Sequence, residues 1–194
     1  MRNRVIAAAF VSAMLLTACG SSSESADTAS DTTVVSSEPS IEFNVDDVMF
    51  AQMMIPHHEQ AIEMSDIAID PTVQAGEKVI ELATQIKGAQ DPEIAQMKSL
   101  LTEWGKPLTA DDDMDHGSMM EGMLSVEDLD ALATRRGTDF DAAWAEAMIA
   151  HHEGAIAMAE DVLDGGVNGA VAELARAIIN GQMAEIETLR AIAG

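Results

Sequence analysis

Two histidine pairs are the residues of this sequence that could do chemistry. His57 and His58 lie in the stretch MMIPHHEQAIEM, His151 and His152 lie in AMIAHHEGAIAM, and the whole chain has only five histidines. Imidazole nitrogen together with thioether sulfur suits a soft, late metal ion such as Cu(I) or Ag(I), whereas Mg²⁺ and Ca²⁺ prefer oxygen. Zinc rarely takes a thioether ligand. The ligands predicted in these two stretches are Met54, His57, His58, Met64, Met148, His151, His152 and Met158.

Helical periodicity places the histidines and methionines on one broad face with the apolar residues. At about 100° per residue, Glu59 and Glu63 fall on the opposite side of the same helix. A single histidine on an apolar face is more often a structural core residue than a ligand. The recurrence of the pair favours a metal site, and a buried, hydrogen-bonded histidine layer is the alternative.

Two later segments add polar residues to the same picture. Gln90 and Glu93, and likewise Gln182 and Glu185, fall toward the apolar faces of their predicted helices. They are predicted to hold the imidazole rings by hydrogen bonds. The alternative is a polar layer that fixes the register of the helices.

A third group of candidate ligands lies in the segment MDHGSMMEGM, which shows no helical or strand pattern. Methionines in such a segment are not explained by core packing. Close Met and His residues in an acidic linker resemble the Met/His-rich copper motifs of periplasmic copper-resistance proteins. We predict a weaker copper capture site here, with an ordinary linker as the alternative. Its ligands would be Met114, His116, Met119, Met120 and Met123.

The elements that must position these residues are helices. Helices are expected over about 45–69, from 73 or 77 to 104, 125–136, 139–163 and from 170 to the end. Three capping pairs are predicted, namely Asn44 with Asp47, Ser125 with Asp128, and Thr138 with Asp141. Pro56 and Pro92 lie inside the first two helices, where we expect local kinks and not breaks.

The two halves of the chain repeat each other. His57 matches His151, Met64 matches Met158, and the match extends to the helices that follow, where Gln90 matches Gln182. Each half is therefore one amphipathic helical hairpin. Two such hairpins bury their apolar faces best against each other, so the fold class is all-α, an antiparallel four-helix bundle with a short extra helix in the central linker.

The N-terminal region is expected to lie outside this bundle. Arg2 and Arg4 precede a short apolar run that ends in LTAC, which predicts a lipoprotein signal peptide over 1–18 with Cys19 lipidated. Cys19 is the only cysteine, so no internal disulfide or thiolate site can form. A disordered Ser/Thr-rich tether is expected over 19–42. The bundle then occupies 43–194, with hairpins at 43–105 and 138–194 and the linker at 106–137.

The formal net charge of −24 bears on the partners. Such a chain repels nucleic-acid phosphates and anionic head groups, so we expect no nucleic-acid partner and membrane contact only through the N-terminal lipid. A protein partner is left open.

The duplicated His-His-x-x-Ala-Ile-x-Met motif, followed by a Gln-x-x-Glu-Ile helix, resembles the domain-of-unknown-function 305 family over about residues 44–194. The resemblance implies a ferritin-like four-helix bundle in an extracytoplasmic protein, and some members are implicated in copper binding and tolerance. Transferred to this chain, it points to the same eight histidines and methionines of the two helical motifs.

The leading hypothesis is a lipid-anchored, extracytoplasmic protein that sequesters or buffers copper without catalysis. Cu(I) is the preferred ion, with Cu(II) and Ag(I) as alternatives. One rival is a metal-free helical interaction module. Another is a di-iron or di-manganese ferritin-like oxidase, which needs inward glutamates and a Glu-x-x-His pattern that the helices bearing His57 and His151 lack. Motifs for nucleophilic hydrolysis and for phosphate loops are absent from the sequence.

Overall fold

The computed structural model describes residues 42–110 and 120–194. The predicted signal peptide, Cys19 and the tether up to residue 41 lie outside the described residues, as do Met114, His116 and Met119. The described part of the chain folds into helices alone. Their bounds are α1 Val45–Ile69, α2 Glu77–Glu103, α3 Val126–Thr134, α4 Gly137–Gly165 and α5 Gly169–Ala193.

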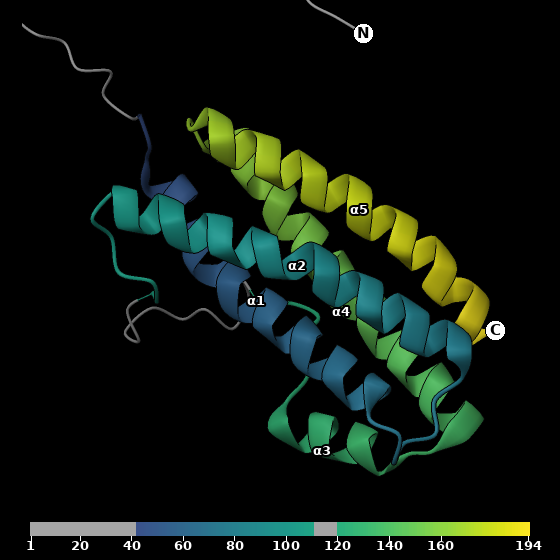
Figure 1. Cartoon of the computed structure of the whole chain (residues 1–194). Coiled ribbons are helices and arrows are strands. Elements are labelled where there is room, and N and C mark those ends of the chain that lie inside the picture. Colours follow the sequence, from purple (N-terminus) through teal and green to yellow (C-terminus); the bar gives the residue numbers. More distant parts are fainter. Residues whose placement is uncertain (1–41, 111–119) are drawn as a thin grey trace, which may run out of the picture. The chain divides into compact units, whose positions relative to one another are not determined.

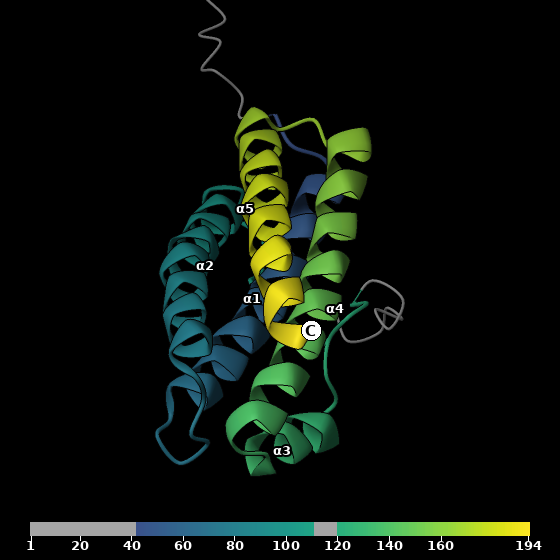
Figure 2. The same ribbon diagram turned by 90° about the vertical axis from the view of Figure 1, so that its right-hand side faces the viewer.

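The helices form two hairpins that pack into one bundle, which confirms the predicted all-α fold. α1 pairs with α2, α4 pairs with α5, and the hairpins join mainly through α1 and α4 (Figure 1). α2 and α5 touch each other much less, and the second view shows them diverging toward one end (Figure 2). α1 and α4 run antiparallel, because Asp46 lies beside Gly165 near one end while the indole of Trp144 donates to the carbonyl of Met64 near the other. None of the described helices is long and apolar enough to cross a membrane.

The core consists of two apolar clusters with polar residues between them. The first cluster takes the beginning of α1 and the end of α4, with residues such as Phe50 and Val162. The second takes the end of α1 and the beginning of α4, with residues such as Met64 and Trp144. The two clusters are related by the sequence repeat. The beginning of α1 lies in the first cluster, and the beginning of α4, which matches it in sequence, lies in the second. The two histidine pairs fall at the middle of α1 and α4, between the clusters.

Two of the three predicted capping pairs are present. Asn44 and Asp47 form a reciprocal capping box at the start of α1. At the start of α3, the Ser125 side chain accepts a hydrogen bond from the Asp128 amide. Pro56 and Pro92 lie inside continuous helices, so neither proline breaks its helix, as expected.

The predicted cap of Thr138 and Asp141 is wrong. α4 begins at Gly137 after Arg136, which makes no side-chain cap. The Asp141 carboxylate instead accepts the backbone N–H of Gly76 in the turn of the other hairpin, at 3.0 and 3.2 Å from its two oxygens. Thr138 lies inside α4 and so cannot cap it, and the Asp141 carboxylate satisfies a turn amide of the other hairpin.

The matching residue Asp47 does the same for the opposite turn. Its fully buried carboxylate accepts the amides of Val167 and Asn168, between α4 and α5, at 3.1 to 3.2 Å. Each hairpin therefore uses the aspartate at its first helix to hold the turn of the other hairpin. This reciprocal pair of contacts fixes the axial register of the two hairpins. The register in turn determines which residues of α1 and α4 meet at the middle of the bundle.

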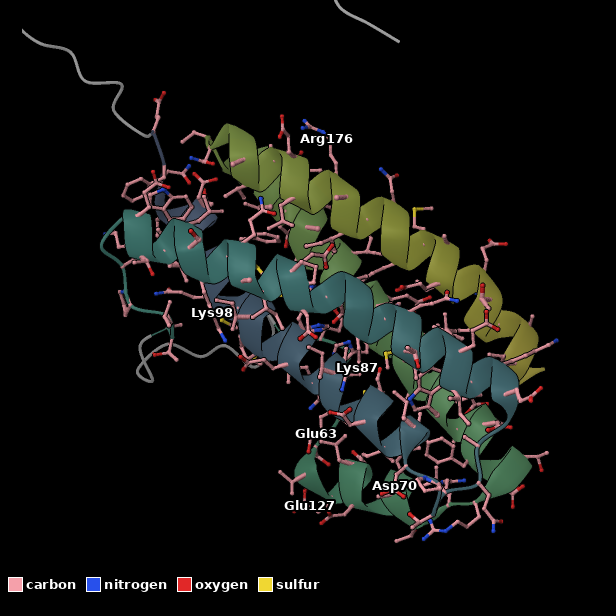
Figure 3. All side chains as sticks on the ribbon, in the orientation of Figure 1. Glu63, Asp70, Lys87, Lys98, Glu127 and Arg176 are labelled. Carbon is pink, nitrogen blue, oxygen red and sulfur yellow. The ribbon has the colours of Figure 1, made fainter. Side chains whose placement is uncertain are left out.

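Exposed ion pairs add little to this arrangement. Lys98 pairs with Glu59 at 2.8 Å and Lys87 pairs with Asp66, so that both lysines join α2 to α1 (Figure 3). Pairs of this kind at the surface contribute roughly 0–1 kcal/mol each. The buried contacts decide the fold.

Candidate metal centre

The two histidine pairs meet at the centre of the bundle. The rings of His57 on α1 and His151 on α4 lie 3.8 Å apart between centroids, at an angle of 44°. His58 and His152 follow them on the same two helices, and all four side chains are fully buried. Because His57 and His151 are matching residues of the repeat and touch each other, the internal twofold axis passes between them. The helix phases predicted this burial, and the antiparallel crossing of α1 and α4 brings the pairs together.

A glutamate from the neighbouring helix holds the second histidine of each pair. Glu93 Oε2 on α2 lies 2.9 Å from His58 Nε2, and Glu185 Oε2 on α5 lies 2.8 Å from His152 Nε2. The helix phases placed both glutamates toward the apolar faces, and a hydrogen bond to an imidazole ring was one of the two interpretations given above for them. Gln90 and Gln182 make no such bond within the described residues. Each bond fixes the orientation of its ring and engages its Nε2, so that only Nδ1 remains for another partner.

Burial keeps the first histidine of each pair neutral. Desolvation by burial, and to a smaller extent the neighbouring imidazoles, lower the pKa of His57 to about 4. The hydrogen bond with the Glu121 carbonyl acts in the opposite direction and raises the pKa. Desolvation and the same neighbouring rings place the pKa of His151 well below its usual range. At neutral pH these two rings are therefore uncharged, and a neutral imidazole is the form that ligates a metal.

Several buried polar atoms of this layer have no hydrogen-bond partner within residues 42–110 and 120–194. They include Nδ1 of all four histidines and Nε2 of His151. The side-chain amides of Gln90 and Gln182 also lack partners there, although each residue is at most 3% exposed. Buried polar groups are usually paired, so a layer with this many open sites indicates a ligand, ordered water or a structural cost that the protein retains.

A loop breaks the symmetry of the layer on one side. Residues 120–125 run alongside α4 toward α3 (Figure 2). The Glu121 carbonyl oxygen lies 3.3 Å from Nε2 of His57, whereas Nε2 of the matching His151 has no partner in the described chain. Gln60 on α1 anchors the loop, since its amide donates to the Leu124 carbonyl at 2.9 Å and accepts the Leu124 N–H at 2.8 Å. The two central histidines thus differ in their surroundings although they match in sequence.

The loop lies against α4 because residue 154 is glycine. A Cβ atom at Gly154 would overlap the backbone of Glu121. Gly122 has a positive φ of 84°, and a Cβ there would meet the backbone of Ala150. Two close approaches of backbone to backbone therefore seat the loop beside the layer.

The methionines predicted as ligands lie in different places. Met54, Met64 and Met148 are fully buried within the two apolar clusters. Met158 is half-buried against the first cluster. Met120 and Met123 are half-buried in the loop that crosses α4. The three fully buried methionines pack as core residues, whereas Met158, Met120 and Met123 keep contact with solvent.

The carboxylates near the layer bear on which kind of metal ion it could hold. In the part of the chain that the structure describes, no group of three or more His, Cys, Asp or Glu side chains is placed to hold a metal. Glu59, Glu63 and Glu153 are exposed, as their helix phases predicted. Glu93 and Glu185 do point inward, but a di-iron or di-manganese centre of the ferritin-like kind takes glutamates from all four helices. A soft ion that needs few ligands fits neutral imidazole and thioether better.

Sequence reasoning missed the residues of α1 that hold the connection between the two hairpins. Gln60 and Gln52 both lie buried on α1, and Gln52 donates to the carbonyls of Pro107 and Thr109 at 2.8 and 3.2 Å. The sequence held one indication of these contacts. Gln60 of the first motif corresponds to Gly154 in the second, although the two motifs otherwise match well. A difference inside a repeat marks a place where the two halves have different neighbours.

Comparison with known proteins places the chain in a family. The family described as Domain of unknown function (DUF305) matches residues 47–193. A DUF305 fragment from Deinococcus radiodurans is 32% identical, with a TM-score of 0.69, and the match covers 78% of this chain and 97% of that one. A DUF305 protein from Streptomyces coelicolor, named a secreted protein, is 30% identical over 74% of this chain and 89% of that one, with a TM-score of 0.69.

A third relative has been solved with metal ions. CopM in its Cu(II)-bound form is 31% identical over 76% of this chain and 95% of that one, with a TM-score of 0.64. CopM has also been solved in Cu(I)-bound, Ag-bound and apo forms. No curated protein matches the chain.

Proposed function

The chain belongs to the DUF305 family, and from that membership and the buried histidine layer we propose that it binds copper outside the cytoplasm. In this proposal it sequesters or buffers Cu(I), with Cu(II) and Ag(I) as further ions, and carries out no catalytic turnover. The predicted lipid on Cys19 would anchor it to the membrane, and the relative named a secreted protein supports an extracytoplasmic location.

One observation carries the proposal. Four buried imidazoles meet at mid-bundle, and their Nδ1 atoms have no partner within the described residues. His57 and His151 are neutral at physiological pH, so metal binding there does not have to displace a proton from an imidazolium. Glu93 and Glu185 orient the other two rings in the way that carboxylates orient metal-bound histidines. The Cu- and Ag-bound forms of CopM show that a relative of this fold holds such ions.

The roles of the individual ligands follow from their places. His57, His58, His151 and His152 would supply nitrogen. Met54, Met64, Met148 and Met158 would supply sulfur after small movements of core side chains, and methionine has the rotational freedom for this. The linker residues Met114, His116, Met119, Met120 and Met123 would form a weaker capture site. The hydrogen bonds predicted from Gln90 and Gln182 to the imidazole rings are not made within the described residues, and in this proposal they would form only when the ion binds.

The test is an anaerobic Cu(I) titration of the purified chain against a chromogenic chelator. Exchange of His57, His58, His151 and His152 for glutamine should abolish uptake that competes with the chelator. The matched control is His116→Gln, the one histidine outside the bundle helices, which should leave this tight uptake in place. Zn(II) and Fe(II) should compete poorly. If the helix variant binds as much copper as the unchanged chain, the histidine layer is not the site.

A metal-free structural layer is the second candidate function. The bonds of His58 to Glu93 and of His152 to Glu185 are complete without a metal, and they are the kind of buried contact that fixes helix register. A chain that binds no copper, and that unfolds at the same temperature with and without Cu(I), would favour this interpretation. In that case the DUF305 bundle would serve as an interaction module.

A further inference from the structure

A cavity of about 190 Å³ opens between α1 and α4 outside the histidine layer. α1 contributes Met49 and Met53, α4 contributes Met158, and the loop contributes Glu121. Met49 and Met53 are one helical turn apart and so present their side chains side by side. Three thioethers from two helices thus border one hollow, and neither Met49 nor Met53 belongs to the ligand set predicted from the sequence.

Of these three methionines, one is buried and two are partly exposed. Met53 is only 4% exposed and forms the inner part of the cavity. Met49 and Met158 are half-buried, so their side chains reach the rim. Core packing explains Met53, Met54 and Met64, which are buried, but it does not by itself explain Met49 and Met158, which line an open hollow and stay partly exposed. Thioether sulfur at an accessible site binds soft monovalent ions such as Cu(I) and Ag(I).

Two carboxylates stand at the same cavity. Asp46 from α1 and Asp161 from α4 are both exposed and both line it. Exposed carboxylates of this kind raise the local concentration of any cation without binding it tightly. The neutral sulfurs would then select the soft ions among them.

The cavity and the buried His57 share a wall. Gly154 lines the cavity, and a Cβ built on it would lie 3.4 Å from Nε2 of His57. Glu121 lines the cavity as well, and its carbonyl oxygen lies 3.3 Å from the same nitrogen. An ion held by the methionines is therefore separated from the histidine layer only by the loop backbone and a glycine without a side chain.

We propose that this cavity is a distinct capture site for a soft monovalent cation, Cu(I) or Ag(I), held by Met49, Met53 and Met158. From here the ion passes to His57 when the Glu121 carbonyl moves aside. The oxidation state of the ion does not change, and only its ligands are exchanged. The transfer step rests on the proposed function of the histidine layer, whereas the capture site itself does not.

The first measurement uses the full chain with ¹³C-labelled methionine methyl groups and Ag(I) as the probe. The methyl signals of Met49, Met53 and Met158 should shift in the course of the Ag(I) titration, once the tighter histidine layer is filled. The signal of Met183, which is 56% exposed on α5, should stay in place. Assignment uses the single Met→Leu exchanges, which conserve side-chain volume. If the three cavity signals do not move while Ag(I) binds, the proposal is wrong.

The second measurement separates capture from transfer. The triple variant Met49→Leu, Met53→Leu and Met158→Leu should bind one Ag(I) fewer per chain and should load His57 more slowly by about tenfold or more, the factor that corresponds to losing one modest interaction. Met183→Leu is the control and should match the unchanged chain. His57→Gln should leave the Ag(I) at the cavity in place while it removes the transfer.

The outcomes distinguish the two proposals. A triple variant that binds and loads Ag(I) like the unchanged chain overturns the capture site and leaves the histidine layer standing. Cavity signals that still shift in the variant without the four helix histidines support the capture site even if the layer holds no metal. An unchanged chain that binds no Ag(I) or Cu(I) at all overturns both.

Discussion

His57 and His151 are matching residues that touch, but each meets a different environment. The Glu121 carbonyl faces Nε2 of His57, while Nε2 of His151 has no partner in the residues described. A ligand at the layer would therefore find one ring nitrogen open and the matching nitrogen covered by the loop. The duplication supplied two equivalent rings, and the loop made them unequal.

The low pKa of His57 predicts how the stability of the metal-free chain depends on pH. Between about 6.5, its usual value, and about 4, the unfolded chain binds a proton that the folded chain does not. This contribution to the free energy of unfolding is complete above pH 6.5 and falls by about 1.4 kcal/mol per pH unit as the pH drops through that window. Chemical denaturation at pH values from about 7 to about 5 measures how the free energy of unfolding changes with pH. His57→Gln should reduce the slope and His116→Gln should not; equal slopes in all three proteins would contradict the assignment.

Gly154 predicts a second effect at the scale of one residue. A methyl group at this position would overlap the Glu121 backbone, so Gly154→Ala should displace the loop and lower the free energy of unfolding by about 1–3 kcal/mol. Gly88→Ala on α2 is the matched control, because nothing lies within 4 Å of its added Cβ. That change should stabilise the chain by up to about 1 kcal/mol through helix propensity. If thermal unfolding shows both variants equally stabilised, the loop does not need the glycine.

At the scale of elements, α1 does more than bury an apolar face. Gln52 bonds the chain just after α2, and Gln60 bonds the chain just before α3. The two glutamines lie two helical turns apart, and each is at most 8% exposed. α1 thus holds both described ends of the connection between the hairpins beside the histidine layer.

The Gln60 contact predicts a local opening. Gln60→Ala removes two hydrogen bonds to Leu124 and should cost about 1–3 kcal/mol. Hydrogen exchange at the Leu124 amide should accelerate, because its acceptor is gone, while amides in the middle of α1 keep their protection. Gln85→Ala on α2 is the control, since Gln85 is exposed and bonds only Glu81 of its own helix. Unchanged exchange at Leu124 would show that packing alone holds the loop.

Periodicity predicted the contacts that depend on one helix or on the repeat. The buried phase of His57, the outward phase of Glu59 and the inward phase of Glu93 all follow from residue spacing along a helix. The bond of Asp141 to Gly76 could not be predicted, because it joins two hairpins across 65 residues of sequence. The contact of the Glu121 carbonyl with His57 could not be predicted either, because the residues of a loop show no helical or strand periodicity.

At the scale of the whole molecule, the twofold repeat explains why the polar residues form one layer. The antiparallel crossing of α1 with α4 brings matching positions together only near the axis, so His57 meets His151 there. Gln90 and Gln182 are matching positions of α2 and α5, each about one helical turn before the glutamate that bonds a histidine. The apolar clusters lie on either side of this layer. A polar centre in an apolar bundle is a stability cost that a ligand-binding role can account for.

That cost predicts the effect of making the layer apolar. The amides of Gln90 and Gln182 are buried and lack partners in the described residues, so Gln90→Leu and Gln182→Leu should each stabilise the metal-free chain by about 1–3 kcal/mol. Exposed Gln85→Leu is the control and should change stability by less than about 0.5 kcal/mol. Denaturant unfolding measures all three. A loss of stability in the first two variants would show that the amides are hydrogen-bonded in solution.

The net charge of −24 predicts how the whole molecule responds to salt. The chain has 34 acidic and 10 basic residues. We therefore expect repulsion among carboxylates to outweigh cross-helix ion pairs such as that of Lys98 with Glu59. Raising NaCl from about 0.02 M to about 0.3 M shortens the screening length below about 10 Å and should raise the thermal midpoint by a few degrees. Glu63 on α1 and Glu127 on α3 are exposed acidic side chains on this surface (Figure 3). Exchanging both for glutamine should raise the midpoint at low salt and shrink its salt dependence, because less repulsion is left to screen. A midpoint that falls with added salt would instead mean that the ion pairs between α1 and α2 outweigh the repulsion.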